Sequence, residues 1–279
     1  MKHLEIDGTV TLTKLQQLDS PDRAPQQGDV PAVILDVETT GLNVDRGEVI
    51  QIALRPFFVS PTTGEVSGVK KNIGFLQEPS YPLDPIITEI TGFTDEDLKG
   101  HKIPWDKVAS LLSKCQFIVC HNAAFDRQWV EKALRKAGQV VPSDAIWCCS
   151  MTQVDWNSIC RASKALEVLC AWHGFFYDSH NATADVDATL HLLRKDSYMK
   201  AMLENAMQPD YHVFAAGSLR EENHLLKQRR YRWNPELSCW WKGVNNLQEA
   251  EIESAWLSEN LEKCEPQHFE IEPQHRFTT

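Results

Sequence analysis

Residues 32–42 read AVILDVETTGL, and this stretch decides the fold of the chain. Its first six residues form an apolar run that only Asp36 interrupts, which is typical of a central strand buried on both faces. Because side chains two residues apart on a strand point to the same side, Asp36 and Glu38 should project together where this strand ends. Two buried carboxylates repel each other and lose hydration, and a divalent cation compensates for both effects. The spacing therefore indicates a metal site, with a solvated strand end as an equally good alternative.

The elements predicted around this strand follow the order of a ribonuclease-H-like fold. Further strands are expected over residues 49–54 (extended by 57–59), 69–76, 117–120 and 145–148. Helices are expected over residues 85–90, 95–98, 105–112, 123–137, 163–173 and 181–195. Three strands joined by short turns, followed by strands that alternate with helices, predict an α/β protein whose mixed sheet is flanked by helices.

The chain is expected to divide into an extension and linker over residues 1–29, a main domain over 30–205 and a small α+β domain over 206–279. In the extension, the apolar residues Leu4, Ile6, Val10 and Leu12 around Asp7-Gly8 predict a short hairpin. In the last region, strands are expected over residues 211–216, 231–233, 238–244 and 268–271, and helices over 219–228 and 247–261. Their order, β-α-β-β-α-β, suggests a ferredoxin-like module.

The composition favours a soluble protein of the cytoplasm, with 42% hydrophobic and 24% charged residues. No apolar run approaches the roughly 18 residues that a transmembrane helix needs, and the N-terminus does not resemble an export signal. The eight cysteines include no C-x-x-C pair, which favours a reducing compartment over a zinc-binding or redox site. The net charge of −11 disfavours broad, charge-driven adhesion to nucleic acid but permits local, metal-assisted contacts.

Two further acids stand on helix faces that should be apolar. Asp126 lies in the first turn of a predicted helix and shares its face with Trp129. The helix dipole explains an acid in the first turn, but it does not explain the apolar face. Asp185 shares its face with Leu192, and His180 stands in the loop just before the same helix. Both acids and this histidine are therefore candidate site residues, although a lone loop histidine is commonly a surface residue.

Three segments of the chain resemble the sequence motifs of the DEDD superfamily of 3'→5' exonucleases. Residues 34–42 resemble the first motif, 121–126 (HNAAFD) the second, and 180–185 (HNATAD) the third in its histidine form. Residues 90–94 and 164–170 are similar to segments that accompany these motifs. The segments are most similar to those of exonucleases like the epsilon subunit of DNA polymerase III (DnaQ-like).

This resemblance implies hydrolysis of phosphodiester bonds from a 3' end by a two-metal mechanism that releases nucleoside 5'-monophosphates. The implied ligands of two Mg²⁺ (or Mn²⁺) ions are Asp36, Glu38, Asp126 and Asp185. The implied general base is His180. The implied contacts of the terminal nucleotide are Thr39, Leu42, Thr91, Phe93, His121 and Asn122. Phe93 would either stack on a base or pack within its loop. The chain departs from the family pattern at residues 149–151 and at Asn181, and these departures affect substrate preference rather than metal binding.

Residues 220–242 hold six basic and three acidic residues, interleaved with aromatic residues. This mixture is typical of segments that bind a nucleic-acid strand. The candidate strand contacts are Arg229, Arg230, Arg232, Trp233 and Trp240. The alternative is that the tryptophans form the core of a small domain, and because Trp240 and Trp241 should face opposite sides of a strand, one can be buried and the other exposed.

These features favour a free-standing exonuclease that acts on nucleic acid with a free 3' end, in particular single-stranded DNA or RNA. A proofreading subunit with a polymerase or other protein partner is the main alternative. A non-catalytic nucleic-acid-binding module is disfavoured, because the set of acidic residues is complete. No membrane partner is expected, and the patterns predict neither an oligomeric state nor a preference between DNA and RNA.

Overall fold

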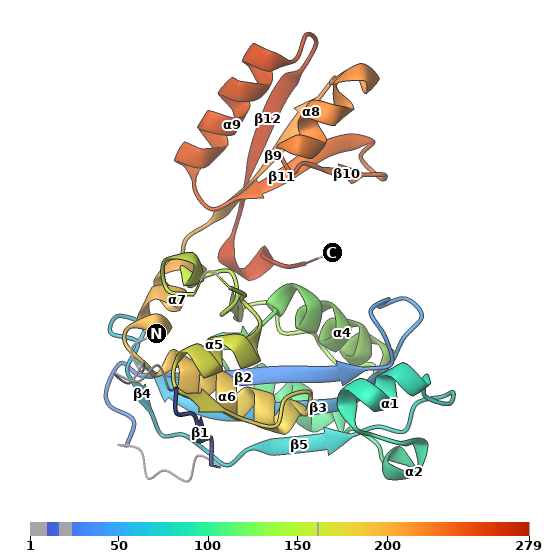
Figure 1. Ribbon diagram of the computed structural model, residues 1–279, viewed down its shortest axis with the longest axis vertical. Helices are drawn as coiled ribbons and strands as arrows, with labels where there is room; N and C mark the ends of the chain where they lie inside the picture. The colour runs from blue at the N-terminus through green and yellow to red at the C-terminus, as the bar shows by residue number, and fades with distance from the viewer. Residues whose placement is uncertain (1–9, 17–23, 161, 279) are drawn as a thin grey trace. The chain divides into compact units, whose positions relative to one another are not determined.

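The computed structural model describes residues 10–16, 24–160 and 162–278 and divides the chain into two compact units (Figure 1). The larger unit comprises Met1–Ala206 and Phe277–Thr279, and the smaller unit comprises Met207–Arg276. Within the described ranges, no helix combines the length and the apolar character that crossing a membrane requires.

A six-stranded sheet of mixed direction forms the centre of the larger unit. Its strands lie in the order β4 (Val66–Ser67), β3 (Val49–Val59), β2 (Val30–Thr39), β6 (Phe117–Cys120) and β7 (Ile146–Cys149), and β5 (Ile73–Leu76) also pairs with β3. β3 runs antiparallel to β2, β4 and β5, whereas β2, β6 and β7 are parallel to one another. Residues 32–35 are completely buried, as expected for a central strand, and the predicted ribonuclease-H-like sheet is confirmed.

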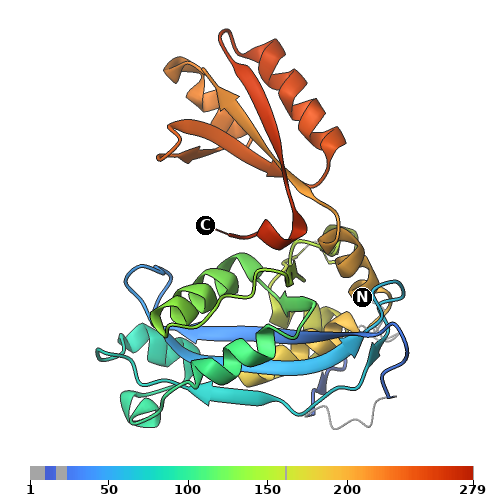
Figure 2. The same cartoon turned by 180° about the vertical axis from the view of Figure 1, so that it is seen from behind.

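Helices cover both faces of this sheet (Figures 1 and 2). α3 (Trp105–Leu112) and α4 (Ala123–Lys136) pack on the face that carries Val33 and Leu35, in a core that also contains Trp147. α6 (Ala182–Leu193) lies on the other face with α5 (Leu166–Trp172) beside it. Because side chains alternate along β2, Asp36 and Glu38 point to the face on which α6 lies.

The structure differs from the sequence prediction at several segments of the larger unit. The strand expected over residues 69–76 is shorter, because Gly68 takes a left-handed φ of 55° between β4 and the irregular segment that precedes β5. Asp196, with a φ of 49°, separates α6 from α7 (Tyr198–Ala206), a helix that was not predicted. β1 (Thr13–Lys14) pairs in parallel with β8 (Phe175–Phe176), a long-range pairing that local patterns do not reveal. The hairpin expected at Leu4, Ile6 and Asp7-Gly8 falls outside the described residues.

The smaller unit has a four-stranded antiparallel sheet in the order β10-β11-β9-β12. Its elements along the chain are β9 (Asp210–Ala216), α8 (Asn223–Gln228), β10 (Arg232–Asn234), β11 (Cys239–Val244), α9 (Leu247–Asn260) and β12 (Glu265–Ile271). β9 and β10 are parallel with β11 between them, and β11 and β12 are parallel with β9 between them. These two interleaved β-α-β units are the predicted ferredoxin-like arrangement.

Both helices of the smaller unit pack on one face of its sheet. The core contains Tyr211, Val213 and Ala215 from β9 together with Leu226 from α8 and Leu257 from α9. The opposite face therefore carries no α-helix in the described part of this unit.

Candidate active site

Asp36 and Glu38 lie where β2 extends beyond its parallel neighbour. β6 pairs with β2 only over residues 32–34, whereas β3 pairs with it along its whole length. On β3, Ala53 lies opposite Asp36 and Gln51 lies opposite Glu38. The two carboxylates therefore emerge side by side near the end of the strand, on the face that α6 covers, and both are half-buried.

Asp185 of α6 joins these two acids. One oxygen from each of Asp36, Glu38 and Asp185 lies within 4.8 Å of the others. Burial, followed by repulsion from neighbouring carboxylates, raises the pKa of Asp36 well above its usual value. Burial and the charge of Asp185 raise the pKa of Glu38 to about 7, and burial raises that of Asp185 to about 6. Acids that hold their protons this strongly need nearby positive charge to be fully ionised at neutral pH.

Asp126 completes the acid cluster from the first turn of α4. Its side chain is buried, and its Oδ1 accepts a hydrogen bond of 3.3 Å from the backbone N–H of Val37. β6 does not reach this part of β2, so the carboxylate satisfies a strand N–H that lacks a partner there. Burial raises the pKa of Asp126 to about 8, although the bond from Val37 opposes this shift. Its charge repels those of Asp36 and Glu38, which places all four acids in one electrostatic cluster.

Buried polar contacts fix the start of α6 against the sheet. The Oε1 atom of Gln51 on β3 accepts a hydrogen bond of 2.9 Å from the backbone N–H of Ala182. Arg55, also on β3, lies 3.4 Å from Asp187 of α6 in an ion pair between almost fully buried side chains. A buried polar group needs its partner nearby to offset the lost hydration, so each of these pairs fixes the position of the helix relative to the sheet. The contacts therefore determine where α6 presents Asp185.

The first turn of α6 also approaches β5 closely. Asn72 donates a hydrogen bond of 2.6 Å from Nδ2 to the carbonyl of Thr183. At Gly74, an added Cβ would lie 2.6 Å from Cγ2 of Thr183, a distance that forces one of the two atoms to move. The glycine on β5 thus allows α6, the helix that carries Asp185, to pack closely against the sheet.

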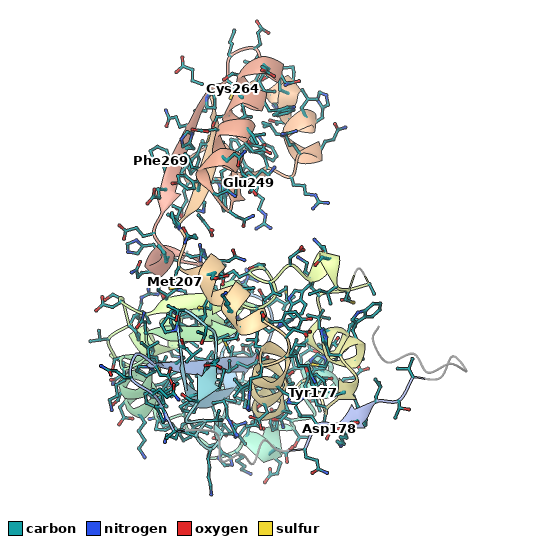
Figure 3. The ribbon with its side chains drawn as sticks, turned by 90° about the vertical axis from the view of Figure 1, so that its left-hand side faces the viewer. Tyr177, Asp178, Met207, Glu249, Cys264 and Phe269 are labelled. Atoms are coloured by element: carbon teal, nitrogen blue, oxygen red, sulfur yellow. The ribbon has the colours of Figure 1, made fainter. Side chains whose placement is uncertain are left out.

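Asp185 is held by two donors, and His180 lies next to them. The hydroxyl of Tyr177 donates to Oδ1 of Asp185 at 2.7 Å, and the N–H of Asn181 donates to Oδ2 at 3.0 Å. Tyr177 lies in the segment that leads into α6 (Figure 3). His180 is exposed and has a left-handed φ of 63°, and its proximity partly offsets the burial that raises the pKa of Asp185. A left-handed non-glycine residue is uncommon and is found disproportionately at functional sites.

Two of the predicted nucleotide contacts are exposed, and a third is bonded internally. Leu42 is 89% exposed, and Asn122 is exposed directly before α4. His121 uses both ring nitrogens inside the protein, since Nδ1 lies 2.7 Å from Oγ of Ser150 and Nε2 lies 2.8 Å from the carbonyl of Lys164. Burial lowers the pKa of His121, so its imidazole is neutral. His121 thus connects the loop before α4 to the segments that carry Ser150 and Lys164, and its contact with a nucleotide stays a prediction.

The other three predicted nucleotide contacts are also engaged within the protein. The hydroxyl of Thr39 donates to the carbonyl of Gly41 at 2.7 Å, and that of Thr91 donates to the carbonyl of Ile87 at 2.9 Å. Phe93 is half-buried against the small apolar cluster that contains Ile87. Of the two alternatives for Phe93, the contacts favour packing within its loop.

In the smaller unit, two of the predicted strand contacts pack or pair within the protein. Trp240 is only 7% exposed and belongs to the core, which corrects the prediction that its ring contacts a strand. Arg229 donates from Nε to Glu253 at 2.8 Å and lies 4.3 Å from the ring centre of Trp256, so its charge is compensated. The remaining predicted contacts are exposed, namely Arg230, Arg232 and Trp233.

The positioning residues Gln51, Arg55 and Tyr177 were not predicted from the sequence. Gln51 and Arg55 are polar residues on the same face of an otherwise buried strand, and this pattern could have indicated partners on a neighbouring helix. Tyr177 offered no such signal, because its bond to Asp185 depends on the path of the loop before α6.

Comparison with known proteins places this site in a family. A family model described as an exonuclease, RNase_T, matches residues 33–193, a range that contains all four acids of the cluster. The chain belongs to this exonuclease family. The resemblance to DEDD-superfamily 3'→5' exonucleases that the motifs predicted is thereby confirmed. The smaller unit lies outside the matched range.

Similar proteins are much longer than this exonuclease-family chain. It is 34% identical over 200 residues to a "DNA polymerase III PolC-type" protein of Streptococcus pyogenes serotype M1, an alignment that covers 68% of this chain and 13% of that protein. It is 27% identical over 205 residues to the protein of the same name from Streptococcus suis, covering 69% of this chain and 13% of that protein. The chain thus spans a small part of the length of these relatives.

Solved structures of Exonuclease I share the fold. The zinc-bound form of the E. coli enzyme in complex with single-stranded DNA superposes with a TM-score of 0.57 at 15% identity, over 83% of this chain and 71% of that one. An apo form of Exonuclease I gives a TM-score of 0.52 at 17% identity, over 67% of this chain and 50% of that one. At these identities the similarity establishes the fold.

Metal binding by the acid cluster should strengthen as the pH rises. Glu38, Asp126 and Asp185 have pKa values raised to about 7, 8 and 6, so protons compete with a cation in this range. Without metal, the folded protein binds protons at these acids more tightly than the unfolded chain does. This difference stabilises the fold fully when the pH is below the pKa values of the unfolded chain, and the stabilisation is lost as the pH rises through about 6 to 8. We therefore expect Mn²⁺ to raise the melting temperature more at about pH 8.5 than at about pH 6, measured against EDTA.

A matched control for this experiment is the exposed acid Glu89 on α1 (Pro85–Thr91). Glu89→Gln should leave the response to Mn²⁺ unchanged. A response that is independent of pH, or larger at the lower pH, would contradict the assignment of the metal site to this cluster.

Proposed function

We propose that this chain is a metal-dependent 3'→5' exonuclease of the histidine subtype, which releases nucleoside 5'-monophosphates from single-stranded DNA. The observation that carries the proposal is the convergence of Asp36, Glu38 and Asp185 within 4.8 Å of one another, with Asp126 buried beside them. Such a cluster is costly without a function, because like charges repel and burial removes their hydration.

The donor set fits two Mg²⁺ or Mn²⁺ ions. All four side chains offer carboxylate oxygens, the ligands that hard divalent cations prefer. Asp36 interacts electrostatically with each of the other three acids. It would help to hold both ions, with Glu38 and Asp185 at one and Asp126 at the other. When bound, a pair of ions at such a site activates water and stabilises the charge that develops on the leaving oxygen.

His180 is the proposed general base. It stands at the exposed rim of the cluster, adjacent to the Asn181–Asp185 contact that holds the third acid. In this role an imidazole nitrogen of His180 would take the proton of the attacking water. Asp185 lies close enough to His180 for their charges to interact.

The DNA substrate is proposed from the relatives. The PolC-type relatives are named as DNA polymerases, and the Exonuclease I neighbour was solved with single-stranded DNA. In this chain the exposed Leu42 ends the first motif, and the exposed Asn122 directly precedes the helix of Asp126. We assign these two residues to the terminal nucleotide, with Thr39 shaping the turn that leads from Glu38 to Leu42.

Asp36→Asn should abolish exonuclease activity while preserving the fold. The amide has nearly the same shape as the carboxylate but removes one charge from the centre of the cluster, so metal binding is lost. Activity is measured with 5'-labelled and 3'-labelled oligothymidine in Mn²⁺, and the fold by circular dichroism. Wild-type activity in a folded Asp36→Asn protein would refute the proposed function.

His180→Ala should lower kcat by about 10²–10⁴-fold, the usual range for a general base. The Michaelis constant should change little, because the cluster that binds the metals remains intact. His224 of α8, which is exposed in the smaller unit, provides the control variant His224→Ala. Equal kcat values for the His180 and His224 variants would remove His180 from the mechanism.

A proofreading role beside a polymerase is the second candidate, because the 34% identical relatives carry a polymerase name. Co-purification of the tagged chain with a polymerase from its own cells would support that role. A chain that degrades DNA at the same rate with and without cell extract would favour the free-standing enzyme.

A further inference from the structure

Aromatic side chains collect on the face of the small sheet that the helices leave open. Along β9, Tyr211, Val213 and Ala215 point into the core, so the alternating residues His212 and Phe214 point to the opposite face. All residues of the smaller unit that carry this argument lie within the described range 162–278.

The strand register brings two more rings to the same face. Trp241 of β11 pairs with Phe214, and Phe269 of β12 pairs with His212. The ring centres of His212 and Trp241 are 4.5 Å apart, and those of Phe214 and Phe269 are 5.8 Å apart. Figure 3 shows Phe269 on the side of the sheet away from Glu249, which belongs to α9. We refer to His212, Phe214, Trp241 and Phe269 as the aromatic face.

The aromatic face is accessible and bordered by polar groups. Phe269 is 54% exposed, and the other three rings are half-buried. Arg232 on the edge strand β10 pairs with Trp241, so its side chain belongs to this face. Arg232 is exposed and forms no ion pair within the described residues. A continuous apolar patch with a polar border usually marks a binding surface.

The chemistry of this face fits unpaired bases better than a second protein surface. Planar rings on neighbouring strands offer successive stacking positions, and four-stranded sheets in RNA-recognition modules present aromatic rings to two or three bases in this way. Burial lowers the pKa of His212, so its ring is neutral and can stack. Arg232 supplies a positive charge for a phosphate. Of the two acids on the same face, Glu265 lies on the opposite edge strand, and Asp210 is paired with Arg276.

We propose that the aromatic face binds single-stranded DNA by base stacking, with Arg232 contacting the phosphate backbone. This inference rests on the proposed exonuclease function, for which it supplies a second hold on the substrate strand. The net charge of −11 disfavours strand binding by long-range attraction. Stacking provides affinity that depends less on salt, because few counterions are released.

The test measures the affinity of the full chain for 5'-labelled oligothymidine by fluorescence anisotropy in EDTA, which prevents cleavage. Trp241→Ala and Phe269→Ala should each weaken binding by about 5- to 150-fold, the range for loss of one stacked base. Phe269→Tyr retains the ring and should bind like the wild type. Circular dichroism and thermal unfolding establish that each variant is folded. Because Phe269 is exposed, Phe269→Ala and Phe269→Tyr should disturb folding less than Trp241→Ala.

The matched control is Ile252→Ala. Ile252 is also exposed, at 55%, but it lies on α9, which packs on the opposite face of the same sheet. Its loss should leave DNA affinity unchanged. Unchanged DNA affinity in folded Trp241→Ala and Phe269→Ala proteins would overturn the proposal, as would variants that weaken binding to oligouridine but not to oligothymidine.

A separate measurement keeps this inference distinct from the proposed function. Hydrolysis of the p-nitrophenyl ester of thymidine 5'-monophosphate by the wild-type protein in Mn²⁺ reports on the acid cluster alone, because the ester is too small to need a strand-binding surface. Absence of hydrolysis would reject the exonuclease, whereas hydrolysis together with unaltered DNA affinity in the ring variants would reject only the aromatic face.

Discussion

Repulsion among buried carboxylates is the constraint on which the rest of the larger unit depends. The half-buried Asp36, Glu38 and Asp185 bring oxygens within 4.8 Å of one another, and the buried Asp126 adds a fourth carboxylate. Each pKa is raised, which means that the fold holds these acids together at a free-energy cost in their ionised form. Only a rigid framework can maintain such an arrangement, and hydrophobic burial of the central strand supplies it.

Polar contacts as well as apolar packing hold the four acids close together. The N–H of Val37, which no strand satisfies, ties β2 to Asp126 of α4. Gln51 and Arg55 tie β3 to the start and the middle of α6. The three segments that carry the motifs are thereby fixed to one sheet although they are far apart in the sequence. A site whose ligands are preorganised in this way needs little rearrangement when a cation or substrate binds.

Local patterns predicted most of the fold and the acids of the site, but not their supporting contacts. The buried run around Asp36, the helix from residue 123 and the order of elements in the smaller unit all follow from periodicity and turn residues. Gln51 and Arg55 were missed because their partners lie far away in the sequence, and Tyr177 because its bond to Asp185 depends on the path of a loop. Alternation placed Trp240 and Trp241 on opposite sides of a strand, yet only the tertiary structure shows which side the helices cover. Because local patterns do not reveal long-range pairing, the pairing of β1 with β8 was not predicted.

The central claim is that the four acids form a site for a pair of divalent cations. Anomalous diffraction at the manganese edge, from crystals of the full chain grown with Mn²⁺ and a nucleoside 5'-monophosphate, tests it most directly. The account predicts two manganese peaks about 3.5–4 Å apart, both bound by Asp36 and flanked by Glu38, Asp126 and Asp185. Manganese bound elsewhere, with these four side chains free of it, would contradict the account.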